Sequence, residues 1–202
     1  FEGPITYTKF KGGQSNPTYR LKRGNGKSYV LRRKPPGKLL SSAHAIDREY
    51  KVITALYQTG FPVPKTYHLC LDEEVIGTWF YIMDMVEGRI FWEGTLPSED
   101  SKSRGMIYDA MNQTIARLHM VDPKKIGLSD YGREGGYIER QISRWSKQYL
   151  NDIESGRLDA MDRLIKWLPE NIPPDDQTSI IHGDFRVDNM ILDAQAPKVI
   201  AV

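Results

Sequence analysis

The sequence of 202 residues has a single cysteine, Cys70, and no long run of apolar residues. One cysteine excludes an intrachain disulfide and a cysteine-rich zinc site, and it is typical of a reducing compartment such as the cytoplasm. No apolar run approaches the ~20 residues that a membrane-spanning helix needs, and no signal peptide is visible. These absences predict a cytoplasmic protein with no membrane partner.

The sequence also has no large excess of positive or negative charge. The sequence has 28 Lys and Arg residues against 26 Asp and Glu residues, which leaves a formal net charge of +2. No stretch interleaves basic and aromatic residues, so nucleic acid is a poor candidate partner. With 40% hydrophobic and 27% charged residues, the chain has the composition of a globular protein, long enough for one large domain or two small lobes. Nothing in it indicates an oligomeric state.

Both ends of the sequence suggest a longer natural protein. The chain begins at Phe1 rather than at Met, and residues 198–202 have the pattern of a buried strand after which nothing follows. We therefore expect that the sequence is truncated at its C-terminus.

The first 87 residues carry mainly strand signals. The expected strands are residues 5–10, 18–21, 28–32, 66–71 and 78–85. Asn25-Gly26 is a strong hairpin signal, and a helix is expected from Ser41 or Ser42 to about Thr59. The turn at residues 12–17 has two interpretations, a simple hairpin connection or a loop over nucleotide phosphates.

The remaining residues carry helical periodicity. Apolar residues at helical spacing predict helices over residues 102–120, 138–153 and 158–168, the last one stopped by Pro169 and the Pro173-Pro174 pair. Because the pattern changes at Val86-Glu87-Gly88, we place a lobe boundary there, with one lobe over residues 1–87 and the second over residues 88–202. The expected fold class is α+β.

The chemistry is concentrated in residues 180–193. Two apolar runs, each short enough for a strand, flank a polar loop in which His182, Asp184 and Asn189 follow the spacing His-x-Asp-x-x-x-x-Asn. This is the spacing of the catalytic loop of kinases, where the Asp accepts the hydroxyl proton and the Asn holds a metal ion. The alternative is a polar connection whose carboxylates face water, since three residues also match by chance.

An ordered set of further motifs resembles the aminoglycoside phosphotransferase family, which is related to the choline kinases. The motifs are Gly-Gly-Gln-Ser-Asn (12–16), Tyr-Val-Leu-Arg (29–32), Asp-Arg-Glu-Tyr (47–50), Met-Asp-Met-Val-Glu-Gly (83–88), Leu-His (118–119) and His-Gly-Asp-Phe-Arg-Val-Asp-Asn (182–189). Residues 29–40 and 47–50 are similar to the kinase-like domain found next to some acyl-CoA dehydrogenases. The resemblance implies a bilobal protein kinase-like fold, with an antiparallel N-lobe carrying one helix and a mainly helical C-lobe.

The resemblance also implies roles for the loop and for the strand at residues 28–32. Asp184 would be the catalytic base that orients the acceptor hydroxyl, and Asn189 would bind a magnesium ion. Arg32 would replace the usual phosphate-binding lysine and pair with Glu49. This is a departure from the family pattern, because Arg and Lys are not interchangeable.

Further residues would surround the nucleotide. Met83 would lie behind the adenine, with backbone groups of Asp84 and Val86 bonded to its edge, and Ser15 and Asn16 would lie over the phosphates. In the loop, His182 would act as a structural brace. Two roles stay open: Arg186 would contact either phosphate or Asp184, and Asp188 would be either an exposed acid or a salt-bridge partner.

The expected function is ATP- and Mg-dependent transfer of the γ-phosphoryl group to a hydroxyl of a small molecule, with a hydroxyacyl metabolite favoured over an antibiotic. The alternative is a non-catalytic kinase-like domain that binds a nucleotide or a partner. Two features motivate this alternative, namely Arg32 in the lysine position and a second metal-binding Asp that the family pattern places after Val202. The sequence does not distinguish ATP from GTP.

Overall fold

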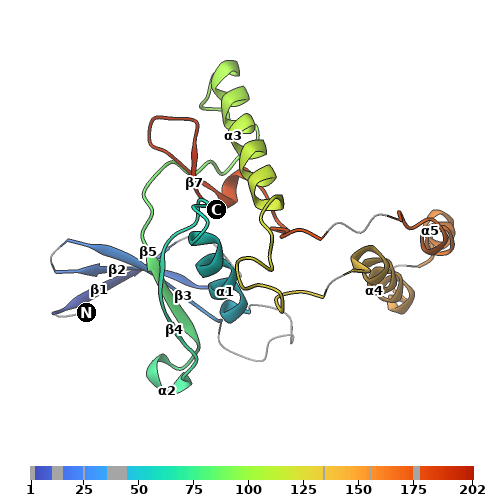
Figure 1. Cartoon of the computed structure of the whole chain (residues 1–202), viewed down its shortest axis with the longest axis horizontal. Helices are drawn as coiled ribbons and strands as arrows, with labels where there is room; N and C mark the ends of the chain where they lie inside the picture. The colour runs from blue at the N-terminus through green and yellow to red at the C-terminus, as the bar shows by residue number, and fades with distance from the viewer. Residues whose placement is uncertain are drawn as a thin grey trace. The chain divides into compact units, whose positions relative to one another are not determined.

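The computed structural model describes residues 3–10, 16–24, 26–35, 45–133, 135–154, 156–174 and 178–202. The chain divides into two compact units (Figure 1). Unit 1 comprises residues 1–128 and 180–202, and unit 2 comprises residues 129–179.

Unit 1 is built on a five-stranded antiparallel sheet with the strand order β1-β2-β3-β5-β4. The strands are β1 (Ile5–Lys9), β2 (Thr18–Arg23), β3 (Ser28–Arg33), β4 (Thr66–Cys70) and β5 (Phe80–Asp84). All five strands expected from the sequence are present. The turn between β4 and β5 contains a short helix, α2 (Glu73–Ile76), which the sequence analysis did not predict. Asp72 begins it by accepting a hydrogen bond from the Glu74 N–H.

Helix α1 (Ile46–Tyr57) packs against β4 and β5. Its apolar residues Ile46 and Leu56 are buried, and the Tyr50 ring meets the Tyr81 ring edge-on with 5.8 Å between centroids. The expected start of this helix at Ser41 or Ser42 lies outside the described residues. A separate cluster of Cys70, Phe80 and Ile82, with Leu21, Tyr29 and Leu31 packed against it, lies on the sheet.

A second core forms around helix α3 (Ser101–His119), whose first turn is capped by the Asp100 carboxylate. It buries Ile107, Met111, Thr114 and Leu118, which recur at helical spacing along one face. This face packs with residues around the hairpin of β6 (Ile191–Leu192) and β7 (Val199–Ala201). The expected C-terminal strand is thus present. The expected strand at Ile180–Ile181 is absent, because this pair enters no ladder among the described residues.

The segment after β5 ties the sheet to this second core. The Arg89 N–H donates to the Leu192 carbonyl and the Leu192 N–H donates to the Arg89 carbonyl, each at 2.8 Å. Gly88 makes this approach possible, since a Cβ at that position would lie 2.2 Å from the Leu192 carbonyl oxygen. Residues 88–128 belong to the same compact unit as the sheet, and the lobe boundary at residue 88 stays a prediction.

Unit 2 consists mainly of α4 (Tyr137–Asn151) and α5 (Asp159–Glu170), which pack against each other. Pro169 does not stop α5 as expected, but lies inside its last turn. The Asn171 N–H donates to the Leu168 carbonyl, and the helix ends at Glu170, one residue after the proline. Among the described residues, no helix is long and apolar enough to cross a membrane.

Candidate active site

The polar loop at residues 182–189 is held by its own apolar residues. Val187 and Met190 are buried in the core that also contains Leu192 and Ile107. Between them, residues Val187–Asn189 form a single 3-10 turn. Because buried residues anchor the turn at both ends, the backbone that carries the polar side chains is fixed. Phosphoryl transfer depends strongly on such positioning of side chains.

Asp184 and Asn189 are brought into direct contact. The Asn189 Nδ2 group donates to the Asp184 backbone carbonyl at 2.8 Å and to Asp184 Oδ2 at 2.9 Å. The amide nitrogen is thereby used, while Asn189 Oδ1 accepts no hydrogen bond from the described part of the chain. The Asp184 side chain is 64% exposed. The pair thus offers an accessible carboxylate beside an amide oxygen.

His182 supports the loop through contacts with Asp184 and Phe185. Its Nδ1 accepts the Asp184 N–H at 3.2 Å, and its ring meets Phe185 edge-on with centroids 5.7 Å apart. Gly183, between the two residues, has a φ of 84°, which few other residues adopt. Desolvation of the ring lowers the pKa of His182, although the Asp184 carboxylate opposes this. The neutral imidazole is the form whose Nδ1 can accept the hydrogen bond.

The structure also shows the partners of Arg186 and Asp188. The Arg186 Nε donates to Asp188 Oδ1 at 3.0 Å, and Arg186 Nη2 donates to Asp188 Oδ2. The hydrogen bond from Arg186 lowers the pKa of Asp188. Arg186 Nε also lies 3.7 Å from Asp184 Oδ1. Asp188 is thus a salt-bridge partner, and of the two contacts proposed for Arg186 the structure shows the one to Asp184.

Three of the expected nucleotide-site residues meet between the sheet and α1. Arg32 Nε on β3 lies 3.0 Å from Glu49 Oε1 on α1 and donates to Oε2 at 3.2 Å. The side chain of Asn16, which is buried, donates from Nδ2 to Glu49 Oε2 at 3.3 Å. The two Nη groups of Arg32 make no hydrogen bond within the described residues, so they remain for an anion.

Tyr81 also belongs to this cluster, although no motif in the sequence indicated it as a site residue. Its side chain is fully buried, and its hydroxyl makes no hydrogen bond within the part of the chain described. Burial, followed by the negative charge of Glu49, raises the pKa of Tyr81 well above its usual value. The alternation of β5 could have placed Tyr81 on the face of Met83, but no motif distinguished it from other strand tyrosines.

The residues expected around the adenine lie at and just beyond the end of β5. Met83 is half-buried and pairs in register with Val30 on one side and Thr66 on the other. The Asp84 N–H donates to the Lys65 carbonyl at 2.8 Å, so a contact from the Asp84 backbone to adenine would use its carbonyl. The Val86 N–H enters no backbone hydrogen bond among the described residues. Ser15 lies outside them.

The Asp84 side chain has a contact that the sequence did not indicate. Its Oδ1 accepts a hydrogen bond from the Tyr67 hydroxyl at 2.7 Å. This bond raises the pKa of Tyr67. It joins β4 to the end of β5 and holds the backbone of that end in place.

The donor set fits a nucleotide with a partly hydrated magnesium ion. Within the described residues, no group of three His, Cys, Asp or Glu side chains could enclose a metal. Asn189 Oδ1 would supply one of the oxygen ligands that magnesium prefers, while the Asp184 carboxylate stays available for the acceptor proton. Magnesium usually keeps several waters and takes further oxygen ligands from phosphate.

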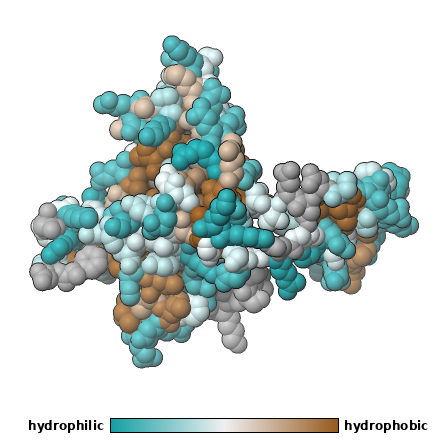
Figure 2. All heavy atoms as spheres, viewed as in Figure 1, coloured by the Kyte–Doolittle hydropathy of each residue, from teal (hydrophilic) through white to brown (hydrophobic). Residues whose placement is uncertain are grey.

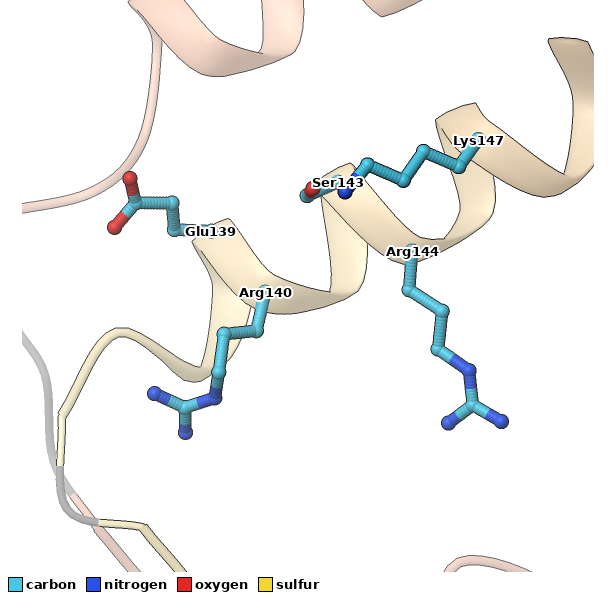
Figure 3. Close-up of a pocket in the computed structure, with 5 residues that line it drawn as sticks. All are labelled: Glu139, Arg140, Ser143, Arg144 and Lys147. Atoms are coloured by element: carbon cyan, nitrogen blue, oxygen red, sulfur yellow. The ribbon is translucent and has the colours of Figure 1, made fainter.

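A shallow open depression of about 610 Å³ lies on α4 in unit 2. It is lined by Glu139, Arg140, Ser143, Arg144 and Lys147, and Figure 3 shows the two arginine side chains leaving the helix on the same side. Arg140 uses its guanidinium on the backbone carbonyls of Arg133 and Gly135. None of the expected site residues lies here.

The fold and the loop together define a domain of the kinase-like phosphotransferase class of folds. The model of the phosphotransferase enzyme family matches residues 6–202. This chain therefore belongs to the phosphotransferase enzyme family, and its antiparallel sheet with helices is the kinase-like fold that the sequence predicted.

Relatives and solved structures agree with this assignment. The Arabidopsis thaliana protein named "Probable acyl-CoA dehydrogenase IBR3" is 48% identical over 96% of this chain and 25% of its own length. The chicken (Gallus gallus) acyl-CoA dehydrogenase family member 11 is 46% identical over 99% of this chain and 26% of its own length. This chain thus spans about a quarter of the length of these relatives.

A Ralstonia eutropha JMP134 protein, provisionally assigned as an aminoglycoside phosphotransferase, is 48% identical with a TM-score of 0.88. The match covers all of this chain and 59% of the solved one. A complex of APH(2″)-IIa with streptomycin and ATP has a TM-score of 0.62 at 19% identity, over 99% of this chain and 64% of that one. At that identity the likeness shows the fold alone.

Proposed function

We propose that this chain carries the nucleotide face and the catalytic loop of an ATP- and magnesium-dependent phosphotransferase that acts on a hydroxyl of a small molecule. The observation that carries the proposal is the double hydrogen bond from Asn189 Nδ2 to the Asp184 backbone and carboxylate. It orients both side chains at once, with the Asp184 carboxylate exposed and the Asn189 Oδ1 left for a metal.

Asp184 would act on the acceptor. Its carboxylate takes the proton of the acceptor hydroxyl as the oxygen of that hydroxyl forms a bond to the γ-phosphorus. The bond from this phosphorus to the β–γ bridging oxygen breaks, and ADP leaves with the electron pair. When bound, magnesium would neutralise the negative charge that develops on the phosphoryl oxygens.

Arg32 would hold the phosphates of the nucleotide. Glu49 binds Arg32 Nε, and Asn16 in turn binds Glu49. Because the guanidinium is planar and rigid, these contacts also fix the directions of its two Nη groups. Arginine binds phosphate oxygens with a planar fork, so it retains the charge of the usual lysine but needs a different geometry. The end of β5 from Met83 to Val86 would receive the adenine.

A hydroxyacyl metabolite is the acceptor we favour. Relatives that are 44–48% identical over this region carry the name of acyl-CoA dehydrogenases, and a kinase region within such a protein would act on a related acyl compound. The buried, unpaired Cys70 supports a reducing compartment such as the cytoplasm.

A transfer assay with the full-length protein tests the proposal. Labelled γ-phosphate is followed from ATP to a panel of hydroxyacyl compounds, in wild type and in Asn189→Ala. We expect transfer by wild type, and a higher magnesium concentration for half-maximal rate in Asn189→Ala. Lys102→Ala on α3 is the control. An unchanged magnesium requirement would contradict the role of Asn189, and absence of transfer from ATP to every compound would contradict the function.

The second candidate is a domain that binds a nucleotide without transferring phosphate. Arg32 in the lysine position is the observation that favours it. A thermal shift with Mg·ATP in both wild type and Arg32→Ala, together with a wild-type protein that transfers nothing, would identify this case.

A further inference from the structure

The Arg186–Asp188 pair lies in the same loop as the catalytic residues, and the proposed function does not use it. Asp188 has 19% of its side chain exposed, and it uses both carboxylate oxygens on Arg186. Two parallel hydrogen bonds between a guanidinium and a carboxylate fix the plane of the guanidinium as well as its position. Arg186 is therefore held in one orientation although its side chain is 63% exposed.

This orientation places a cation beside the Asp184 carboxylate. Arg186 Nε lies 3.7 Å from Asp184 Oδ1, too far for a hydrogen bond but close enough for attraction. Asn189 binds the other carboxylate oxygen, Oδ2. The two oxygens of Asp184 thus have different neighbours, an amide on one side and a positive charge on the other.

One part of the guanidinium remains unused. An arginine side chain has five N–H donors, and Asp188 takes those of Nε and Nη2. Arg186 Nη1 donates no hydrogen bond to any described residue. Because the guanidinium is rigid, Asp188 also fixes the direction of Nη1, in a guanidinium whose Nε lies 3.7 Å from Asp184 Oδ1.

An exposed ion pair of this kind contributes little to stability, about 0–1 kcal/mol, so stability does not account for its geometry. The proposed transfer brings a phosphoryl group with negative oxygens up to Asp184, where two like charges would repel. A cation held at this point would offset that repulsion and would stabilise the charge that the phosphoryl oxygens carry during transfer.

We propose that Arg186 is a catalytic residue that binds the transferred phosphoryl group through Nη1, and that Asp188 is the positioning residue that holds it there. This inference rests on the proposed function. Arg186 takes no proton and forms no covalent bond; the bond changes are those of the transfer from ATP to the hydroxyl, with the proton going to Asp184.

The experiment compares Arg186→Ala, Arg186→Lys and Asp188→Asn in the full-length protein, with Arg163→Ala on α5 as the matched arginine control. We expect Arg186→Ala to lower kcat by about 10²- to 10³-fold, as loss of a preorganised donor does, with a smaller change in the KM for ATP. Arg186→Lys should retain more activity than Arg186→Ala. Free guanidinium at millimolar concentration should partly restore Arg186→Ala but not Asp188→Asn.

A kcat of Arg186→Ala within twofold of wild type would overturn the inference. It would also be overturned by an equal loss in Arg186→Lys with no recovery in guanidinium, because that pattern identifies a structural role. Failure of the function is distinguishable, since it appears as absence of transfer in wild type.

A binding measurement tests the role of Arg186 even if the wild-type protein transfers no phosphate. The affinity for Mg·ADP with aluminium fluoride, which mimics the phosphoryl group in transfer, should fall at least tenfold in Arg186→Ala, while the affinity for Mg·ADP stays within twofold. Equal affinities of wild type and Arg186→Ala for the aluminium fluoride complex would overturn the role of Arg186.

Discussion

The helices of unit 1 and unit 2 carry apolar residues at helical spacing but bury these residues to different extents. In unit 1, α3 buries Ile107 to 1% and Leu118 to 2% exposure. In unit 2, α4 and α5 have no fully buried residue among those described, and Trp145 and Trp167 remain 57% and 55% exposed. Figure 2 shows hydrophobic side chains at the surface over the α4–α5 pair, and also over the end of the sheet at β4.

The residues to which we assign a role lie in the unit where α3 buries apolar residues, although both units have helices with apolar residues at helical spacing. All the described residues to which we assign a role in transfer belong to unit 1, where buried Val187 and Met190 anchor the loop that carries Asp184 and Asn189. Unit 2 has amphipathic helices and a basic depression on α4, and we assign no role in transfer to its described residues. A helical pattern therefore predicted where helices form, and it did not predict how deeply they are buried.

The largest expected effect is at the catalytic carboxylate. Asp184→Asn in the full-length protein should lower kcat by about 10²- to 10⁴-fold, because the amide cannot accept the hydroxyl proton. Steady-state transfer kinetics measure this, with Asp159→Asn in α5 as the control from unit 2. A kcat for Asp184→Asn that equals that of Asp159→Asn would remove the functional distinction between the units.

The difference in burial predicts unequal costs for cavities. Ile107→Ala in α3 should destabilise unit 1 by about 2–5 kcal/mol, the range for a truncated core residue. Leu164→Ala in α5, where the side chain is 43% exposed, should cost about 1 kcal/mol, since only part of its surface is removed from water. Hydrogen exchange followed separately in peptides of α3 and α5 measures both. Equal costs would show that the α5 face is covered in solution.

The close approach at Gly88 predicts a smaller effect within unit 1. Gly88→Ala should destabilise the chain by about 1–3 kcal/mol, as overpacking does, because its Cβ would meet the Leu192 carbonyl and the Ile191 side chain. Gly105→Ala in α3 is the matched control. No atom lies within 4 Å of a Cβ there, so this change should stabilise by about 0.5–1 kcal/mol. Chemical denaturation compares the two, and a Gly88→Ala protein as stable as wild type would contradict the close contact.

The smallest effect is a pH dependence of unit 1 from His182. Its pKa is lowered in the folded state, so between the two pKa values the unfolded chain binds more protons and stability rises with pH. The contribution should be complete above the unfolded pKa of about 6.5 and should be lost as the pH falls through the folded value. The difference in unfolding midpoint between wild type and His182→Gln, measured from pH 8 to pH 5, tests this sign. A difference that grows as the pH falls would contradict it.

Much of the local structure could be predicted from the sequence. Strand alternation and turn residues located β1 to β5, and apolar spacing located α3, α4 and α5 within a few residues. The errors share one cause. Ile180–Ile181 has strand composition but no partner strand among the described residues, and Pro169 lies where a helix can still close its last turn on the Leu168 carbonyl. Composition alone does not report either circumstance.

The site residues proposed from the sequence stay a prediction, but the structure brings several of them into contact. The contact between Asp184 and Asn189 could be expected from the sequence, because both residues lie in one short loop. The pairing of Arg32 with Glu49 was also foreseen, since a helix flank and a neighbouring strand bring such charges together. The structure adds Tyr81 to that pair, which no local pattern indicated, and it shows that Asn16, expected over the phosphates, binds Glu49.

By itself, the sequence determined the elements, the family and the residues of the loop, because propensity, periodicity and motif spacing act over a few neighbouring residues. The tertiary structure alone decided which oxygens and nitrogens remain available. Asn189 has its Oδ1 left over because its Nδ2 is used on Asp184, and Arg186 is held beside Asp184 because Asp188 takes two of its nitrogens. Hydrogen-bond partners depend on the positions of atoms in space, and only the folded chain sets those positions.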